Sequence, residues 1–421
     1  VSARAAMFGG GGAPKPTAGV SGGPAKKQDG SLLYHVLKLD DTSKRPLSIS
    51  CFALNKDGSM VAFSPNNNEV YIAEFKDGTF NVVHVLAEHD QRVTSIDWAP
   101  NTNRILTCSE DRNAYVWDCD GVWKPTLVLL RINRAATYAK WSKNEKKFAV
   151  ASGQSCVAVC HYEEESNWWV SKLVEGFQST VLTVAWHSSD IVLAAGSSDG
   201  TVRLFTAAVK GVDSKPSQIF GPDVSFKKMG AEICCINTNA WVQDMAFSPS
   251  SNVLAYTTQD SCMHFLPVVS GAVPTEESVQ SVRCSGLPHR RLLFVAEDTV
   301  VAGGHDNNPT VFAKAGEQWK EGMKLDAAKE VKQESSASAS SRSVAFKKFE
   351  MSSSQGIDDN NSASVAVLPT IHQNSISGLA ACEAWSSGGR SSKIVSVGLD
   401  GRLVFWPVPS LEEAMKNLSL S

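Results

Sequence analysis

A unit of about 43 residues repeats along this 421-residue chain, and the repeat constrains the fold more than any other feature. A polar landmark residue marks each copy. In the copy that reads SEDRNAYVWDCD, the landmark Asp111 precedes Trp117 by six residues. Successive landmarks lie 44, 43, 45, 61, 46 and 94 residues apart, which indicates seven units with two insertions. The landmarks are Asn67, Asp111, Gln154, Asp199, Asp260, Asp306 and Asp400.

Apolar residues keep fixed distances from the landmarks. In each of the first five units a bulky anchor precedes the landmark by 13 residues, and a second apolar residue follows the anchor by seven. In the second unit these two residues are Trp98 and Ile105. Short runs of β-branched and aromatic residues alternate with Asn, Asp, Gly and Ser, which predicts strands and turns rather than helices. The five anchors are Leu54, Trp98, Trp141, Trp186 and Phe247.

A period near 43 residues that ends in Trp-Asp is typical of the WD repeat, which forms one four-stranded blade of a propeller. We therefore predict an all-β fold, a seven-bladed WD-repeat β-propeller with a disordered N-terminal tail and a flexible insertion between blades six and seven. The segment SLLYHVLKL is expected to close the ring as the outer strand of blade seven. The expected boundaries are 1–30 for the tail, 31–410 for the propeller, 31–39 for the closing strand, 207–240 and 326–366 for the insertions, and 411–421 for a C-terminal segment.

The repeated polar residues predict structural hydrogen bonds. Asp111 suits a tight turn, and His89 is placed to bridge it to a strand hydroxyl such as Thr107 or Ser109, toward the indole of Trp117. A second complete set occurs near the C-terminus, because His372 precedes Ile376 by the same four residues that separate His89 from Val93. A structural role for both histidines is preferred over a role as catalyst or ligand. The structural residues predicted in this way are His89, Asp111, Trp117, Asp199, Asp260, Asp306, His372, Asp400 and Trp406.

Composition and residue pattern exclude several classes of function. Forty Lys and Arg against 43 Asp and Glu give a net charge of −3, so global charge does not favour nucleic acid or an anionic membrane as partner. The ten cysteines contain no C-x-x-C pair, and we expect no metal site and no cofactor. The aspartates are spread one per unit instead of converging, so no catalytic residues are assigned and an enzyme is not expected.

The N-terminal 30 residues contain no secretory signal, and no stretch of the chain is apolar enough to span a bilayer. Basic residues precede the first acid, Asp29, as they do in a weak transit peptide. Repeated Gly and Pro would break the helix that a transit peptide needs, so a flexible tail on a cytoplasmic protein is the preferred interpretation.

The segment DRNAYVWDCDGVWKPTLVLLRINRAA, residues 111–136, resembles the WD-repeat subunit of the actin-related protein two/three complex. EHDQRVTSIDWAP, NWWVSK, STVLTVAWH, VAGGHD and GLDGRLVFW are similar as well, and the resemblance covers about residues 31–421. It implies a non-catalytic subunit of the actin cytoskeleton that supports nucleation of branched filaments. The implied partners are the actin filament, the actin-related proteins, the small subunits of the complex and the acidic tails of nucleation-promoting factors. The competing hypothesis is another WD scaffold, such as a substrate receptor of a ubiquitin ligase.

The insertion 326–366 is rich in serine, with eleven in positions 335–364, and such a composition does not bury enough apolar area to fold alone. Within SRSVAFKKFEM, Ala345, Phe346 and Phe349 would share one face of a short helix. This stretch either folds back on the propeller or protrudes. The resemblance implies a protruding arm that contacts actin, with Val344, Ala345, Phe346 and Phe349 as the contact residues.

Two other segments are candidate contact sites. Arg131 and Arg134 lie at a junction between units, where their guanidinium groups would either clamp a carboxylate of another subunit or remain solvated or paired within the chain. The insertion 207–240 is either a lid over the blades or a contact with another subunit.

Overall fold

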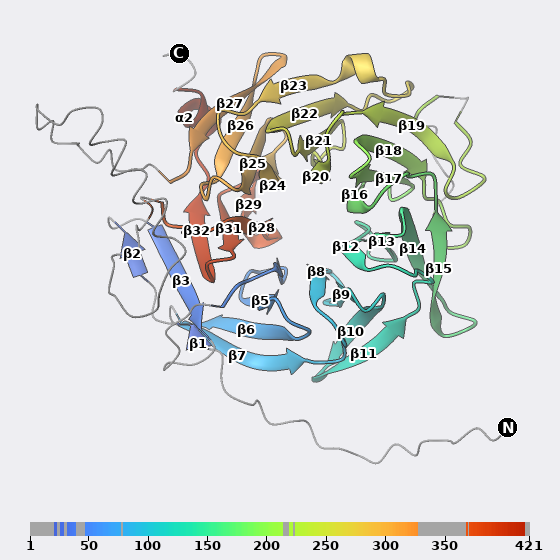
Figure 1. The fold of residues 1–421 in the computed structure, drawn as a ribbon, viewed down its shortest axis with the longest axis horizontal. Coiled ribbons are helices and arrows are strands. Elements are labelled where there is room, and N and C mark those ends of the chain that lie inside the picture. Colours follow the sequence, from blue (N-terminus) through green and yellow to red (C-terminus); the bar gives the residue numbers. More distant parts are fainter. Residues whose placement is uncertain are drawn as a thin grey trace, which may run out of the picture.

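The computed structural model is a closed ring of seven four-stranded antiparallel sheets (Figure 1), which confirms the predicted all-β propeller. It describes residues 47–76, 79–213, 219–221, 224–326, 368 and 370–416, together with the backbone of three short strands near the N-terminus. One α-helix, α2 (Leu411–Lys416), lies within the described residues, in the expected C-terminal segment. None of the helices in the described part of the chain has the length and apolar character that crossing a membrane requires.

The strands occupy four equivalent positions in the seven blades. The innermost strands are β4 (Cys51–Leu54), β8 (Val93–Trp98), β12 (Ala136–Trp141), β16 (Val181–Trp186), β20 (Val242–Phe247), β24 (His289–Ala296) and β28 (Ile376–Ala380). The second strands are β5 (Met60–Ser64), β9 (Ile105–Ser109), β13 (Lys147–Ser152), β17 (Val192–Ser197), β21 (Val253–Thr258), β25 (Thr299–Gly304) and β31 (Lys393–Gly398).

The third strands are β6 (Val70–Lys76), β10 (Ala114–Asp120), β14 (Cys156–Glu163), β18 (Thr201–Thr206), β22 (Cys262–Pro267), β26 (Thr310–Ala315) and β32 (Arg402–Pro407). The outer strands are β7 (Thr79–Leu86), β11 (Val122–Val128), β15 (Trp168–Val174), β19 (Glu232–Asn237), β23 (Gln280–Arg283), β27 (Gln318–Lys324) and β3 (Leu32–Lys38). Outside these positions lie β1 (Ser21–Gly22), β2 (Lys26–Gln28) and the hairpin of β29 (Ser386–Ser387) and β30 (Arg390–Ser391).

The seven-residue offset between anchor and second apolar residue is a strand register. Trp98 on β8 lies directly opposite Ile105 on β9, and Trp141 on β12 lies opposite Phe148 on β13. Each anchor ends an innermost strand and its partner lies at or next to the start of the second strand, so the offset measures the connecting hairpin. The same pairing joins Leu54 to Val61, Trp186 to Leu193 and Phe247 to Leu254.

The core lies between the blades. Alternate side chains of a strand point to opposite faces of its sheet, so each blade contributes apolar residues to both of its neighbours. Among the described residues, seven buried clusters fill the seven junctions between adjacent blades. The last junction packs Phe52 and Phe63 of blade one against Val395 and Leu403 of blade seven, so the core is continuous around the ring.

The ring closes through segments from the two ends of the chain. β3 pairs antiparallel with β32, which places Tyr34 opposite Val404, and the two strands lie side by side in Figure 1. β1 pairs with both β3 and β7 and thereby joins the sheets of blades seven and one, while β2 pairs with β3. The expectation that residues 1–30 form a tail throughout is therefore wrong for β1 and β2. Backbone N–H and C=O groups on a sheet edge can pair with almost any sequence, and composition alone did not indicate these strands.

The insertion expected at 207–240 is shorter than predicted. Residues 232–237 form β19, the outer strand of blade four, so the extra chain ends at about residue 231. Its described part packs against the ring, because Phe220 and Phe226 are buried in the junction of blades four and five. The sequence EICCIN, residues 232–237, was not predicted as a strand because a long polar connection precedes it.

Candidate interaction sites on the propeller

A buried hydrogen-bond network in blade two links His89, Thr107 and Trp117. Nδ1 of His89 lies 2.8 Å from Oδ2 of Asp111, and Nε2 lies 2.8 Å from Oγ1 of Thr107. The indole N–H of Trp117 donates to the same hydroxyl oxygen at 3.0 Å. Burial raises the pKa of Asp111, but the bonds from His89 and from the backbone N–H of Asn113 outweigh it and leave this pKa below its ordinary value. The network thus holds an ionised carboxylate in the turn between the second and third strands of blade two.

Blade seven contains the same network. Nε2 of His372 lies 2.6 Å from Oγ of Ser396, and the indole N–H of Trp406 donates to that oxygen at 2.7 Å. Nδ1 of His372 lies 3.2 Å from Oδ1 of Asp400. Gly398 is required here, since a Cβ at this position would lie 2.4 Å from Asp400 and 2.7 Å from His372.

Several landmark residues share a turn geometry that explains why aspartate is favoured at these positions. The carboxylates of Asp111, Asp199 and Asp400 each accept the backbone N–H two residues later, at 2.9 to 3.1 Å. The residue directly after each of the three has a positive φ of 71° to 79°. A short acceptor side chain therefore fixes a tight turn between the second and third strands. All three also accept an N–H from the loop that enters the innermost strand, and so join two loops of one blade.

Asp260 and Asp306 occupy equivalent turns with different partners. Asp260 accepts a hydrogen bond from the hydroxyl of Thr258 at 2.5 Å. Asp306 accepts the backbone N–H of Leu287 at 2.9 Å, and its second oxygen lies 3.2 Å from Nζ of Lys324. Neither turn reproduces the network of blades two and seven.

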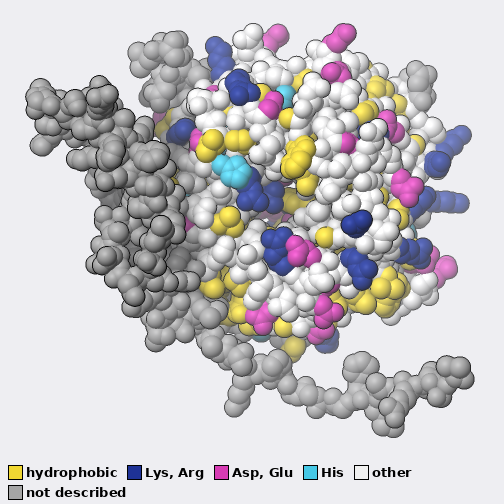
Figure 2. All heavy atoms as spheres, in the orientation of Figure 1, with side chains coloured by type: hydrophobic (Ala, Val, Ile, Leu, Met, Phe, Trp, Pro, Cys, Tyr) yellow, Lys and Arg dark blue, Asp and Glu magenta, His cyan; other side chains and the backbone are white. Residues whose placement is uncertain are grey.

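Arg131 and Arg134 lie in the loop that joins β11 to β12, and both are exposed. No other described residue forms a hydrogen bond or ion pair with either guanidinium group. Leu129 in the same loop is 51% exposed, and Trp241 and Leu287, in the loops that enter blades five and six, are 57% and 54% exposed. Figure 2 shows one face of the ring, where Lys and Arg side chains lie near the centre with hydrophobic side chains around them. The connecting loops therefore offer guanidinium groups and apolar surface for contact with other proteins.

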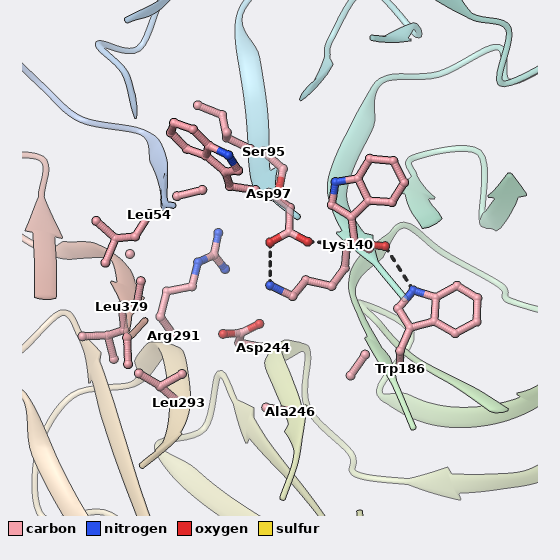
Figure 3. A pocket seen from close by; sticks show the side chains of 18 of the residues that line it. Leu54, Ser95, Asp97, Lys140, Trp186, Asp244, Ala246, Arg291, Leu293 and Leu379 are labelled. Atoms are coloured by element: carbon pink, nitrogen blue, oxygen red, sulfur yellow. Dashed lines mark hydrogen bonds and ion pairs between the residues drawn. The ribbon is translucent and has the colours of Figure 1, made fainter. Parts of the chain in front are cut away.

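A pocket of about 500 Å³ opens at one end of the central channel, lined by residues of all seven innermost strands. Four charged groups point into it (Figure 3): Asp97, Lys140, Asp244 and Arg291. Nζ of Lys140 donates to Oδ1 of Asp97 at 2.7 Å, and Nε of Arg291 donates to the backbone oxygen of Ser377 at 3.1 Å. Sequence reasoning missed this pocket, although a charged residue next to an apolar anchor, as in Asp97-Trp98, is a usable signal.

The two aspartates of the pocket, Asp97 and Asp244, lie in different environments. Asp244 accepts bonds from the hydroxyl of Thr183 at 3.0 Å and from the N–H of Leu292 at 3.0 Å. Burial nevertheless raises its pKa above the ordinary value. Asp97 holds Lys140 in its charged form, because its attraction outweighs the burial that lowers the lysine pKa and the net effect raises it. The polar side chains that line the pocket thus join neighbouring blades through hydrogen bonds and an ion pair.

The arm residues Val344, Ala345, Phe346 and Phe349 lie outside the described residues, as does nearly all of the insertion 326–366. Of that insertion only the first residue, Asp326, is described, and the described chain resumes at residue 368 and from residue 370 onward. Asp326 is buried, and its Oδ2 accepts the backbone N–H of Ile371 at 2.6 Å. The N–H of Asp326 donates to Oδ1 of Asn308 at 3.0 Å. These bonds hold the start of the insertion next to Ile371, which follows its expected end, at the junction of blades six and seven.

Comparison with protein families matches residues 80–118 and 170–206 to the WD domain, G-beta repeat. Each matched segment runs from the outer strand of one blade through the first three strands of the next, so the sequence repeat is offset from the blade by one strand. Because of this offset, each sequence repeat contributes strands to two neighbouring blades.

The chain is similar to curated proteins over most of its length. Actin-related protein 2/3 complex subunit 1A-B of Xenopus laevis is 40% identical over 379 residues, which is 88% of this chain and 97% of that protein. Subunit 1A of Arabidopsis thaliana is 38% identical over 88% of this chain and 97% of its own length. Subunit 1 of Saccharomyces cerevisiae is 34% identical over 87% and 95%. With a seven-bladed ring of WD repeats and identities of this size along nearly all of each relative, the chain belongs to the family of actin-related protein 2/3 complex subunit 1.

Proposed function

We propose that this chain is the propeller subunit of an actin-related protein 2/3 complex, a non-catalytic scaffold that supports nucleation of branched actin filaments. One observation carries the proposal: the identity to subunit 1 proteins extends over 87% to 88% of this chain in animal, plant and yeast relatives. A rigid ring suits a scaffold, because its strands hold many loops in fixed relative positions. The proposed location is the cytoplasm, at the actin cytoskeleton.

The insertion between blades six and seven is proposed to dock the complex on the side of an existing filament. The support is its composition and its attachment. Phe346 and Phe349 lie at helical spacing in a serine-rich segment, and Asp326, its first residue, is bonded to Asn308 and to Ile371, which follows the segment. An apolar helix face held at a fixed point on a rigid body is suited to a groove on a neighbouring protein.

Replacement of Phe346 and Phe349 by Ala tests this docking. The variant complex is expected to assemble normally and to form fewer branches on pre-formed filaments, measured by pyrene-actin assembly and by microscopy. Ser352→Ala with Ser353→Ala, in the same insertion, serves as the control and leaves branching unchanged. Normal branching by the phenylalanine variant would refute docking through the arm without affecting membership of the complex.

The acidic tails of nucleation-promoting factors are proposed to contact the exposed arginines of the connecting loops. Arg131 and Arg134 support this role, since both are exposed and no described residue neutralises either side chain. Bidentate bonds from a guanidinium group suit a carboxylate. Arg131→Glu with Arg134→Glu should weaken binding of an acidic tail peptide to the assembled complex, with Lys124→Glu on an exposed outer strand as the control.

Native co-purification separates this function from the competing one. A subunit of the proposed complex should elute with two actin-related proteins and several small subunits. A substrate receptor of a ubiquitin ligase, the alternative WD scaffold, should instead elute with cullin adaptors, and that result would overturn the proposal.

A further inference from the structure

Blade five brings together three side chains of metal-binding types at the start of one strand. Cys262 and His264 lie on the same face of β22, and Asp260 lies in the turn directly before it. One carboxylate oxygen, the thiol sulfur and one imidazole nitrogen lie within 4.8 Å of one another. Sequence reasoning expected no metal site because it looked for C-x-x-C spacing, whereas a strand brings ligands together at every second residue.

These three groups match the ligands that Zn²⁺ uses in proteins, namely a thiolate, an imidazole and a carboxylate. In a tetrahedral site with ligand bonds of about 2.0 to 2.3 Å, the ligand atoms lie about 3.5 Å apart. The three side chains would therefore close by about 1 Å, which small rotations of their side chains can supply.

The imidazole of His264 is already oriented. Nδ1 lies 2.8 Å from Oγ of Ser281 on the neighbouring strand β23. Nε2 lies 3.0 Å from Oγ1 of Thr258, which donates its own proton to Asp260 and therefore accepts from the Nε2–H group. An ion bound at Nε2 would displace this bond and leave the ring proton on Nδ1, where Ser281 accepts it. Metal-ligating histidines usually hydrogen-bond through their second nitrogen, and Ser281 provides that bond.

A metal ion binds these groups in their deprotonated forms, so it must displace the proton of the Cys262 thiol. Nη1 of Arg283, 3.8 Å from the sulfur, opposes a cation by its charge.

Access and burial agree with a site at the surface of the blade. Asp260 is exposed, Cys262 is half-buried and His264 is buried, so the three ligands form a path from solvent into the junction between blades. We infer that Asp260, Cys262 and His264 bind one divalent transition-metal ion, with Zn²⁺ as the best match and a water molecule at the open fourth position. This site is separate from the proposed role in the actin-related complex and would add a metal link to blade five.

Co²⁺ is the probe for this site, because a cobalt–thiolate bond gives a charge-transfer band in the near ultraviolet and visible bands that report tetrahedral coordination. The purified full-length chain is titrated with Co²⁺ and then with Zn²⁺, after removal of metal by a chelator. We expect one equivalent of Co²⁺ to produce both sets of bands and Zn²⁺ to abolish them.

Five variants locate the ion. Cys262→Ser should abolish the charge-transfer band and His264→Gln should weaken binding, whereas Cys119→Ser, which removes an exposed thiol on blade two, should leave the titration unchanged. Ser281→Ala should weaken binding by about ten- to hundredfold, as expected when the partner of a ligating histidine is lost. Arg283→Gln should tighten binding, since it removes a positive charge beside the sulfur.

Two results would overturn the inference. One is the absence of a thiolate band in the folded parent protein, with folding verified by its circular dichroism spectrum. The other is a band that persists in Cys262→Ser or is lost in Cys119→Ser, which would place the cobalt elsewhere. A His264→Gln variant that binds as tightly as the parent would contradict the assigned ligand set.

Discussion

Lys147 and Asp213 form a buried ion pair, with 2.5 Å between Nζ and Oδ2 and side chains that are 0% and 4% exposed. The ammonium group also donates to the backbone oxygens of Asp190 and Ala207 at 2.7 and 2.9 Å. Burial lowers the pKa of Lys147, and the bond to Asp213 opposes this. A lysine of blade three thus fastens the insertion that follows β18 to the body of the propeller.

Breaking this pair on one side should be costly. Lys147→Met leaves the Asp213 carboxylate buried without its cation, and we expect the free energy of unfolding to fall by about 3 to 5 kcal/mol. Lys147→Met with Asp213→Leu removes both charges and should recover most of that loss. Denaturant unfolding of the full chain measures both, and equal losses in the single and double variants would show that the pairing contributes little.

In blades two and seven the indole N–H of a buried tryptophan donates to a hydroxyl of the second strand. Loss of that one N–H group should lower the free energy of unfolding. Trp117→Phe keeps most of the buried ring but removes the indole donor to Thr107, so we expect a loss of about 1 to 2 kcal/mol in unfolding free energy. Trp406→Phe should behave alike through Ser396. Trp168→Phe, at an exposed indole, is the control. An unchanged denaturation midpoint in both buried variants would mean that the indole bond contributes nothing.

His289 should make the propeller sensitive to mild acid. It is 2% exposed, neither ring nitrogen has a partner among the described residues, and burial lowers its pKa to about 4 despite the nearby Asp306 and Glu321. The ordinary value is 6.5, so the unfolded chain takes up this proton first. Stability is therefore complete above pH 6.5 and falls as the pH drops toward 4.

His289→Leu should flatten that profile. Between about pH 7 and pH 5 the parent is expected to lose about 2 kcal/mol through this residue, and the variant should not. Replacement of the exposed His84 by Gln is the matched control. Urea unfolding at several pH values measures the slope, and parallel profiles for the parent and His289→Leu would rule out His289 as the titrating group.

Removal of β3 should open the ring. Without residues 32–38, β32 loses its outer neighbour and exposes a row of unpaired backbone groups, so we expect aggregation or proteolysis of blade seven. Deletion of residues 1–20 retains all strands of the described structure and should be tolerated. Limited proteolysis and light scattering compare the two, and a stable monomer without β3 would show that closure is unnecessary.

The sequence alone determined the number of blades and the positions of their turns, because both depend on local spacing. The seven-residue offset from Trp98 to Ile105 is the length of one hairpin, and the preference for Asp at Asp111 or Asp400 comes from a bond to an N–H two residues away. The strand β19 and the strands β1 and β2 were missed, since their pairing depends on distant partners that local pattern does not reveal.

Only the tertiary structure decided which charged residues meet. Asp97, Lys140, Asp244 and Arg291 come from different blades, and the ring brings them to one pocket. Lys147 and Asp213 are 66 residues apart and pair because the insertion folds back on blade three. Contacts of this kind depend on closure of the whole ring, which a repeat predicts in outline but does not resolve residue by residue.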